Sequence, residues 1–423
     1  MKILVIGSGG REHSVIKSIS KSSNCSKIFA LPGNGGTSLL AQNIEGDVND
    51  FDFIKSIVID KGINLVFVGP EDPIVQGIYD FFKSDSDLQD INIIAPSKHA
   101  ALLEGSKDFA KDFMDKYKIP TAKHKTFTKK NINESNSFLE SMSPPYVLKA
   151  DGLAAGKGVL IINDLDEAKA ELRNMILNEK FGKSSAKVVI EEFLKGTELS
   201  CFVLTDGKNY KILPYAKDYK KIGEGDTGLN TGGMGAISPV PFTDSKFLSK
   251  IENKIIKPTI DGIFKEGMQY FGFVFIGLIK VKDDPYVIEY NVRMGDPETE
   301  VVFPRINNDL LELFNSMGKP KFNSIELDIK RDNAATVILV SGGYPLEYKK
   351  GMLIEGIEIK DDTIVFHSGT KKIRDKYYTN GGRVLAVTSL SENYQKALKN
   401  SYAKIKKIKF EGMYYRKDIG FDL

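Results

Sequence analysis

The first hundred residues alternate between short apolar runs and segments whose apolar residues have helical spacing. The apolar runs lie at residues 2–7, 27–31, 64–68 and 92–95, and the segments with helical spacing at 11–22, 51–62 and 73–84. Strands that alternate with helices are typical of a parallel sheet with helices on both faces. The pattern therefore predicts a doubly wound parallel α/β domain over residues 1–103.

The pattern changes after residue 104. A helix that ends before Pro120 and a short polar helix precede strands of the half-buried, partly antiparallel kind at residues 146–150, 159–162, 188–194 and 199–206. Two further apolar runs, 272–281 and 285–292, form a strand pair joined by a short polar turn. Glycine-rich residues 209–240 lack periodicity and predict a long functional loop. We expect an α+β domain over 104–320, with a mobile lid at about 121–193.

The tail has the pattern of a small α/β domain. Residues 316–332 form a polar boundary, and apolar runs follow at residues 334–345, 355–359, 363–370 and 383–390. Residues 391–408 form a lysine-rich amphipathic helix, which we interpret as a solvated face and not as a nucleic-acid patch. We place the third domain at residues 321–423.

Composition excludes several classes of function. The 59 basic and 56 acidic residues give a net charge of only +3, which favours neither nucleic acid nor a membrane surface as partner. The cysteines, Cys25 and Cys201, are far apart and have no metal-ligand spacing, which fits a reducing compartment. No apolar stretch approaches the ~18 residues that a membrane span needs. We therefore expect a cytoplasmic protein without a membrane partner.

Residues 146–162, YVLKADGLAAGKGVLII, resemble a phosphate-binding loop but lack the P-loop spacing. Three residues separate Gly152 from Gly156, and Lys157 is followed by Gly158 where a P-loop needs a hydroxyl. Strands flank the loop on both sides, so it predicts a glycine-rich hairpin tip that covers a triphosphate with backbone N–H groups, while Lys149 and Lys157 supply charge. The alternative is a hairpin tip that only turns the chain.

The loop after the first strand partly matches a dinucleotide fingerprint. Gly7 and Gly9 fit, but Glu12 stands at the third glycine position, and the second strand lacks a ribose-binding acid. A dinucleotide is therefore disfavoured. The helix that begins near Arg11 can still offer its N-terminus and a guanidinium to a single phosphate, and a plain turn is the competing interpretation.

Polar residues at strand ends suggest one binding site for a metal ion and another for a nucleotide. Glu289 and Asn291 are two apart on a strand and share one face with Arg293, an oxygen pair that suits Mg²⁺ carrying phosphates. The backbone of residues 192–194 can pair with an adenine edge and Glu198 with ribose hydroxyls, although acids at strand ends are common. The glycine-rich segment 223–235 and its polar neighbours suggest a lid or a substrate cradle, with a disordered insert as the alternative.

Thirteen segments, in chain order, resemble those of the glycinamide ribonucleotide synthetases, a family of ATP-grasp ligases. The specific ones contain NTGGMGA, the RMGDPE run and LKADGLAAGKGV, and GGREH and GPED narrow the choice within the superfamily. The others include VIEEFLKGTELS, LLEGSKDFAKDFM, FHSGT, GGRVLAV and EGMYYRKDIG. The thirteen segments span essentially the whole chain. The resemblance implies that ATP, glycine and 5-phosphoribosylamine give glycinamide ribonucleotide, ADP and phosphate through a glycyl phosphate, in de novo purine biosynthesis.

The resemblance also implies roles for individual residues. Mg²⁺, or Mn²⁺, would be held by Glu289 and Asn291. ATP would be surrounded by Lys107, Lys149, Gly156, Lys157, Gly158, Glu191, Glu192, Phe193, Leu194 and Glu198. The two small substrates would face Gly10, Arg11, Glu12, Glu71, Asp72, Asn230, Gly295 and Asp296. Catalysis would rest on the charges of Arg293, Lys220 and Asp218, and we expect a monomer.

The chain departs from the family pattern at three places. Met294 stands where Phe is usual, and Glu300 where Gln is usual, which would add a negative charge near the metal. The strand at 272–281 has no metal-binding acid, so only one metal cluster is supported. Two other hypotheses are an ATP-grasp ligase for a different carboxylate or amine, and a nucleotide-binding regulator or NAD-dependent dehydrogenase, against which Glu12 speaks.

Overall fold

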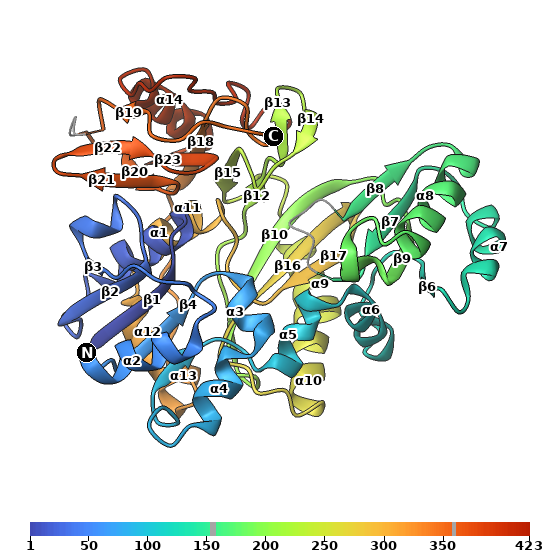
Figure 1. Cartoon of the computed structure of the whole chain (residues 1–423), viewed down its shortest axis with the longest axis horizontal. Coiled ribbons are helices and arrows are strands. Elements are labelled where there is room, and N and C mark those ends of the chain that lie inside the picture. The colour runs from blue at the N-terminus through green and yellow to red at the C-terminus, as the bar shows by residue number, and fades with distance from the viewer. Residues whose placement is uncertain (153–157, 358–360) are drawn as a thin grey trace.

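The computed structural model describes residues 1–152, 158–357 and 361–423. Its N-terminal part is the predicted parallel sheet, in the order β3-β2-β1-β4-β5. The strands are β1 (Lys2–Gly7), β2 (Lys27–Pro32), β3 (Gln42–Asn43), β4 (Leu65–Val68) and β5 (Asn92–Ile94). The helices are α1 (Gly10–Ile19), α2 (Phe51–Lys61), α3 (Glu71–Gln76) and α4 (Ile78–Ser84). Figure 1 shows this part in dark and light blue.

A second sheet carries the glycine-rich hairpin. Its antiparallel order is β6-β9-β7-β8, from β6 (His124–Thr128), β7 (Tyr146–Ala150), β8 (Val159–Ile162) and β9 (Lys187–Glu192). The helices α7 (Ser135–Glu140) and α8 (Leu165–Leu177) pack on it, and apolar residues of both share one core with the sheet. This unit stands at the right of Figure 1, away from the N-terminal sheet.

The central sheet contains the predicted strand pair. Its order is β11-β10-β16-β17, from β10 (Thr197–Thr205), β11 (Tyr210–Ile212), β16 (Gly272–Val281) and β17 (Asp284–Asn291), all antiparallel. Its helical neighbours are α5 (Lys98–Gly105), α6 (Lys107–Lys116), α9 (Ser245–Ile251) and α10 (Lys257–Lys265). It joins the second sheet at a bridge between Thr121 and Val287 and through a hydrogen bond from Lys149 to the Ile288 carbonyl.

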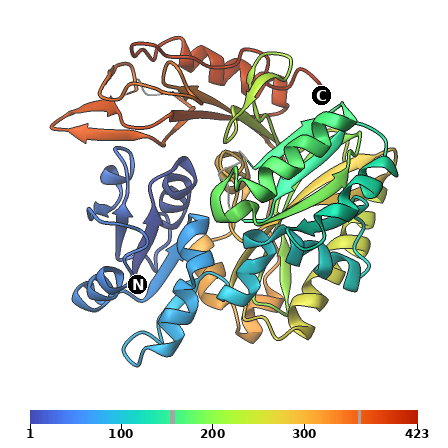
Figure 2. The ribbon, with the colours of Figure 1, turned by 45° about the vertical axis from the view of Figure 1, so that its right-hand side comes forward.

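The C-terminal sheet departs from the sequence expectation. It contains β18 (Asn333–Val340), β20 (Ile364–His367) and β23 (Arg383–Ser391), but also β12 (Lys217–Asp218) and β15 (Gly235–Ser238), in the order β12-β15-β18-β23-β20. With the hairpin of β13 (Lys221–Gly223) and β14 (Thr227–Asn230), these strands show that the prediction of an irregular loop over 209–240 is wrong. Figure 2 shows the lime strands beside the orange sheet. The domain boundaries stay a prediction.

Smaller elements complete the chain. The helices α11 (Thr299–Val302), α12 (Leu310–Ser316) and α13 (Pro320–Ser324) follow β17, and α14 (Tyr394–Ile405) packs on β18 and β23. The strands β19 (Leu353–Ile354), β21 (Thr370–Ile373) and β22 (Lys376–Thr379) form a separate small sheet. Over the described part of the chain, every helix is too short or too polar to cross a bilayer.

Phe67 connects the N-terminal and central sheets. This β4 side chain is 1% exposed, and its ring centroid lies 6.1 Å from that of Phe273 on β16 and 5.8 Å from that of Phe314 on α12. All three rings belong to one apolar core that reaches from β1 to β16. The relative position of the two sheets therefore depends on packing and not only on chain connection.

We predict that Phe67→Ala destabilises the protein by about 3–5 kcal/mol, because it removes a buried ring from a core that cannot fully collapse around the space. Chemical denaturation, followed by circular dichroism, measures the loss. Phe264→Ala is the control, since that ring is 58% exposed and its removal leaves the core intact. Equal effects of the two substitutions would contradict the connecting role of Phe67.

Candidate active site

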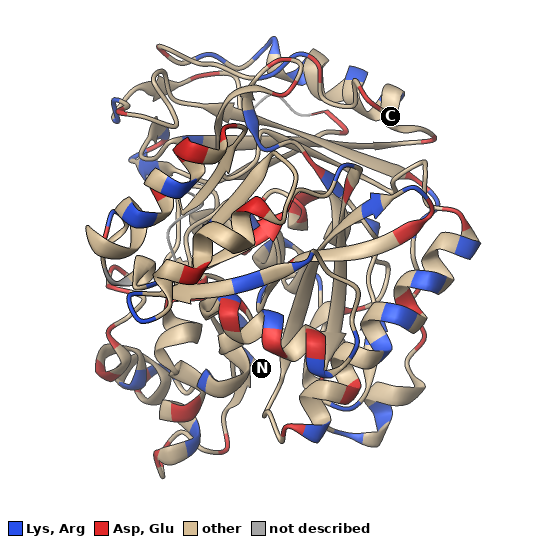
Figure 3. Cartoon of the chain, turned by 90° about the vertical axis from the view of Figure 1, so that its right-hand side faces the viewer, with Lys and Arg blue, Asp and Glu red and all other residues tan. Residues whose placement is uncertain are grey.

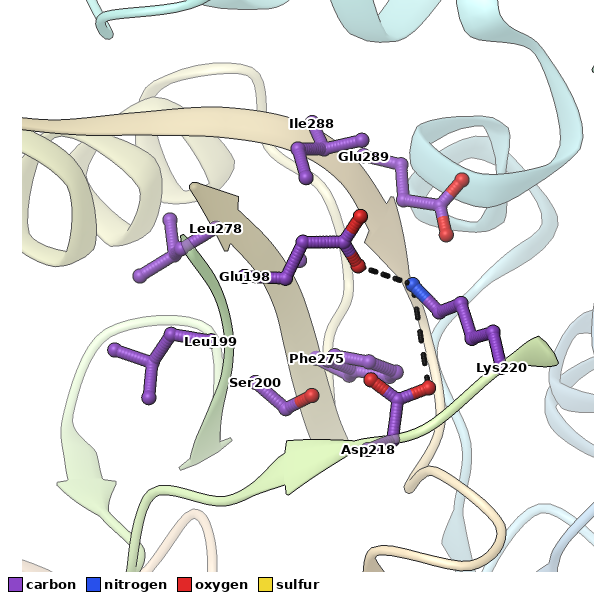
Figure 4. A pocket seen from close by; sticks show the side chains of 10 residues that line it. Glu198, Leu199, Ser200, Asp218, Lys220, Phe275, Leu278, Ile288 and Glu289 are labelled. Atoms are coloured by element: carbon purple, nitrogen blue, oxygen red, sulfur yellow. Dashed lines mark hydrogen bonds and ion pairs between the residues drawn. The ribbon is translucent and has the colours of Figure 1, made fainter. Parts of the chain in front are cut away.

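A pocket lies over the central sheet, where β10, β16 and β17 meet the segment around β12. It is lined by Glu198, Leu199, Ser200, Asp218, Lys220, Phe275, Gly277, Leu278, Ile288 and Glu289. Figure 4 shows the side chains of Glu198, Asp218 and Glu289 gathered around the ammonium group of Lys220. The lining combines four charged side chains with apolar residues of β10, β16 and β17, a mixture that is typical of ligand sites.

Lys220 lies among three carboxylates in this pocket. Its Nζ is 2.9 Å from Glu198 Oε2 and 4.0 Å from Asp218 Oδ2. Asp218, then Glu198, raise the pKa of Lys220 well above its usual range, and Glu289 adds to the effect. The same interaction lowers the pKa of Glu198, whereas burial raises that of Asp218. Lys220 is therefore a permanent positive charge.

Two more lysines meet at Glu191, at the end of β9. Lys149 Nζ lies 3.0 Å and Lys111 Nζ 3.1 Å from Glu191 Oε2, and all three side chains are buried. Burial opposes ionisation of Glu191, but the two lysines outweigh it and lower the pKa of this carboxyl. Glu191 Oε1 has no hydrogen-bond partner among the described residues. One carboxylate thus holds two cations beside a free acceptor.

Glu289 and Asn291 fit the donor set of a magnesium ion. Both lie at the end of β17, where Glu289 is opposite Gly277 and Asn291 opposite Phe275 on β16. Glu289 lines the pocket, and the buried Asn291 Nδ2 has no hydrogen-bond partner among the described residues. No group of three or more acidic, histidine or cysteine ligands exists in the part of the chain described. Two oxygen ligands suit Mg²⁺, which keeps water and phosphate ligands.

Arg293 joins this strand end to the N-terminal domain. Its Nε lies 3.2 Å from Glu71 Oε2 at the start of α3, and its Nη2 lies 3.1 Å from Glu104 Oε1 and 3.3 Å from Asn291 Oδ1. Burial opposes ionisation of Glu71, but Arg293 and Arg11 outweigh it and lower the pKa of Glu71. The guanidinium therefore links an expected metal ligand to an expected substrate contact.

Arg11 and Glu12 form a hydrogen-bonded pair in the first turn of α1. Arg11 Nε lies 2.6 Å from Glu12 Oε1, Arg11 Nη1 donates to the Met294 carbonyl, and the Gly9 N–H donates to Glu12 Oε2. Asp296 Oδ2 accepts from the Arg11 backbone N–H at 3.1 Å. The Glu12 carboxylate thus accepts the hydrogen bond of a backbone N–H at the start of the helix. A dinucleotide fingerprint has glycine at this position.

Glu300 does not lie where we expected it. Its carboxyl is fully buried under Gly10, where an added Cβ would stand 2.2 Å from Glu300 Oε1, and near the Ser368 hydroxyl. Burial, and then Asp296, raise the pKa of Glu300 well above its usual range, while Arg383 works in the opposite direction. Burial therefore favours the protonated form of Glu300, whose carboxyl lies beside α1 and not beside Glu289.

Several expected site residues are not brought into these networks. Asp72, Phe193 and Asn230 are exposed, and Leu194 is half-buried. Glu192 pairs through its carboxylate with the Lys123 N–H, and Lys107 Nζ donates to the Gly152 carbonyl at 3.4 Å. Gly158 closes the β7–β8 hairpin through its carbonyl, and Gly295 packs on Glu298. Gly156 and Lys157 lie outside the described residues.

Sequence reasoning missed four residues of the site. Lys111 and Glu104 lie on α6 and α5 and look like ordinary helix residues in the sequence. Arg383, in the GGRVLAV segment, pairs with Asp296 at 3.1 Å and donates to the Gly232 carbonyl. Glu298 accepts from the Ser200 hydroxyl, and burial, with Asp218, raises the pKa of Glu298 to about 7. Glu298 and Arg383 fall in the RMGDPE and GGRVLAV motifs, and Glu104 and Lys111 fall in the family-like segment LLEGSKDFAKDFM, so the sequence marked these stretches without singling out the four residues.

Three family models cover most of the chain. Residues 1–104 match the N domain of phosphoribosylglycinamide synthetase, residues 105–299 its ATP-grasp (A) domain and residues 334–422 its C domain. The phosphoribosylamine–glycine ligase of Caldanaerobacter subterraneus is 43% identical over 419 residues, which are 99% of each chain.

Solved structures agree with these matches. The crystal structure of phosphoribosylamine–glycine ligase from Thermotoga maritima aligns with a TM-score of 0.84 and 35% identity, over 99% of this chain and 100% of that chain. The biotin carboxylase domain of 2-oxoglutarate carboxylase from Hydrogenobacter thermophilus, in complex with MgADP and bicarbonate, aligns with a TM-score of 0.72 and 15% identity, over 98% and 91% of the chains. The second likeness concerns the fold alone.

We predict that Glu300→Gln becomes more stabilising, relative to the unchanged protein, as pH rises. The pKa of Glu300 is raised in the folded state, so above its unfolded value of 4.5 folding retains a proton that the unfolded chain releases. The free energy of unfolding of the unchanged protein then falls by up to about 1.4 kcal/mol per pH unit until the pKa of Glu300 in the folded state is reached. Glutamine does not titrate, so the variant does not show this loss. Melting temperatures of both proteins between pH 5 and pH 8 measure the difference, and a constant difference would refute a neutral Glu300.

Proposed function

The chain belongs to the phosphoribosylglycinamide synthetase family, and from this membership we propose that it is the ATP-dependent ligase that joins glycine to 5-phosphoribosylamine. The products are glycinamide ribonucleotide, ADP and phosphate, in de novo purine biosynthesis. The observation that carries the proposal is the pocket of Figure 4, where cationic and oxygen-ligand side chains converge from β10, β12 and β17.

The reaction consists of two transfers. A glycine carboxylate oxygen takes the γ-phosphoryl group of ATP, so that ADP leaves and glycyl phosphate forms. The amine nitrogen of phosphoribosylamine then attacks the glycyl carbonyl carbon, the C–O bond to phosphate breaks and the amine releases a proton. The protein supplies position and charge in this scheme, and no side chain becomes covalently bound.

The lysines around the pocket are suited to the polyphosphate. Lys149 and Lys220 lie on opposite sides, at Glu191 and Glu198, and each is held by a carboxylate in the absence of nucleotide. Lys107, at the start of α6, lies beside the same hairpin. We assign adenosine to the edge formed by residues 191–194 and Glu198, because this segment offers backbone groups at the end of β9. Gly156, Lys157 and Gly158 would cover the phosphates.

Glu289 and Asn291 would hold Mg²⁺ or Mn²⁺, with nucleotide phosphates completing the ligand set. The bound ion would neutralise phosphate charge during transfer. Arg293, which contacts Asn291, orients that amide and presents a guanidinium between the phosphates and the N-terminal domain. Asp218 keeps Lys220 in place through its carboxylate.

The α1 N-terminus is assigned to the phosphoribosylamine. Gly10 and Arg11 begin the helix and Glu12 lies in its first turn, while Glu71 and the exposed Asp72 begin α3 and would face the same substrate. A helix N-terminus favours an anion such as the sugar phosphate. Asn230, Gly295 and Asp296 would line the glycine side of the site. Glycyl phosphate reacts with water, so closure of the β6-β9-β7-β8 sheet, about residues 121–193, would protect it.

The organisation proposed with this function has three domains, at residues 1–103, 104–320 and 321–423. A monomer in the cytoplasm is sufficient for it, since both substrates are small molecules and every assigned residue comes from one chain. Figure 3 is consistent with this proposal, because basic and acidic positions are interspersed along the ribbon.

We predict that ADP forms from Mg-ATP and phosphoribosylamine, generated in place, much faster with glycine than with alanine or acetate. A coupled assay for ADP over a panel of small acids measures the preference. If glycine is no better than the other acids, the chain is an ATP-grasp ligase for a different carboxylate. A thermal shift with NAD and none with ATP would favour a dehydrogenase and refute the ligase.

We predict that Glu289→Ala lowers kcat by at least about a hundredfold while the melting temperature stays within a few degrees, because the substitution removes an ion ligand and not a core residue. Glu45→Ala, at an exposed position of the N-terminal part, serves as the control for loss of a carboxylate. Turnover of Glu289→Ala near that of the unchanged protein would remove Glu289 from the site.

A further inference from the structure

The β13–β14 hairpin begins directly after Lys220. The Lys220 carbonyl accepts hydrogen bonds from the backbone N–H and the hydroxyl of Thr231, both at 2.8 Å, and Lys221 pairs with Asn230 across the hairpin. Four of the hairpin residues, 227–230, are exposed. Much of the hairpin is exposed, so the direction of the Lys220 side chain depends on the contacts that fix its end residues.

The C-terminal segment, residues 414–422, holds this hairpin. The Tyr414 hydroxyl donates to the Ile222 carbonyl at 2.9 Å, and the Gly225 N–H donates to Asp418 Oδ2 at 2.7 Å. The two segments are about 190 residues apart in the sequence and adjacent in Figure 1, where the C-terminus lies beside β13. Part of this segment, EGMYYRKDIG, is a family-like motif without a role in the proposed reaction.

Arg416 is the centre of this contact. Its side chain is fully buried, and its Nη1 donates to Asp226 Oδ1 at 2.6 Å and to the Lys221 carbonyl at 3.2 Å. Its Nε and Nη2 both bind the Asp418 carboxylate at 2.8 Å. The guanidinium carbon also lies 5.5 Å from the Tyr219 ring centroid. Arg416 therefore contacts the residues on both sides of Lys220.

A buried guanidinium is tolerated only when its donors are matched, and a planar fork can serve several acceptors at once where an ammonium group cannot. We propose that Arg416 is a positioning residue for Lys220: it holds the Tyr219 ring and the Lys221 carbonyl, on either side of Lys220, so that the Lys220 ammonium points into the ligand pocket. The C-terminal segment thereby contributes to the nucleotide site without touching it. The inference rests on the proposed function only for the identity of the ligand.

The first test is a double-substitution cycle with Arg416→Lys and Lys220→Met. Titration calorimetry with a non-hydrolysable ATP analogue and Mg²⁺ measures the dissociation constant of each protein. Arg416→Lys is expected to weaken binding about tenfold, and to have less than a twofold effect when Lys220 is already methionine. Independent, multiplying effects would show that Arg416 acts only on general stability and would overturn the proposal.

Two further variants keep the test informative if Arg416→Lys does not fold. Asp226→Asn removes one charged partner of Arg416 at a half-exposed position. Asparagine readily adopts the φ of +54° found there, so the variant is expected to keep the fold. It is expected to weaken binding of the analogue two- to threefold. Arg331→Lys, an exposed arginine, is the matched control and is expected to bind as the unchanged protein does. Unchanged binding by Asp226→Asn and a folded Arg416→Lys would overturn the proposal.

Hydrogen exchange separates this inference from the proposed function. In Arg416→Lys and Asp226→Asn, the amides of residues 221–231 are expected to exchange at least tenfold faster, with the rest of the chain unchanged. A protein that binds the analogue but forms no ADP with glycine would refute the glycine ligase and leave the positioning role supported. Unchanged exchange in the hairpin of both variants would refute the positioning role, whatever the substrate is.

Discussion

The structure depends on the balance of buried positive charge by carboxylates. Lys149 and Lys111 are buried and share Glu191, and the largely buried Arg293 lies between Glu71 and Glu104, whereas the pair of Lys220 with Glu198 is partly exposed, at 43% and 47% of the two side chains. An isolated buried ammonium or guanidinium group would be costly, so each cation needs its partner while no anionic ligand is bound. These ion pairs also hold the side chains in place, which means that little reorganisation is needed when phosphate arrives.

The end of strand β17 links these ion pairs to the rest of the fold. Glu289 and Asn291 alternate at its end, and Arg293, two residues beyond it, reaches Glu71 of α3 and Glu104 of α5. Its neighbour β16 packs on Phe67 of β4, so apolar and polar contacts fix the same two sheets relative to each other. A site assembled from separate parts of the chain then has a defined geometry, because both kinds of contact must break together.

Periodicity was sufficient for the regular elements. It gave the parallel strands β1, β2, β4 and β5 and the β16–β17 pair, since buried runs and polar turns follow from local residue choice. It could not give β12 and β15, which are two and four residues long: β15 pairs with β18, about 100 residues later, and β12 pairs with β15. Short strands of this kind depend on tertiary contact more than on propensity.

The site was predictable to the extent that motifs marked it. Glu289, Lys220 and Glu198 do line one pocket, whereas Lys111 and Glu104 have helical spacing that is typical of any amphipathic segment. The environment of Glu300 was not predictable, because the side chain becomes neutral only through burial under Gly10 and proximity to Asp296. Sequence indicates residue chemistry, but the pKa of a buried group depends on neighbours that folding brings together.

The shared sheet limits how the chain can be divided. β15 pairs with β18 along four residues, so a fragment ending near residue 320 would leave an apolar strand with unpaired backbone donors and acceptors. Such an edge is a template for association between copies. Separate expression of the catalytic part would therefore require a replacement strand, and a circular permutant that keeps β15 next to β18 is the more suitable way to move the chain ends.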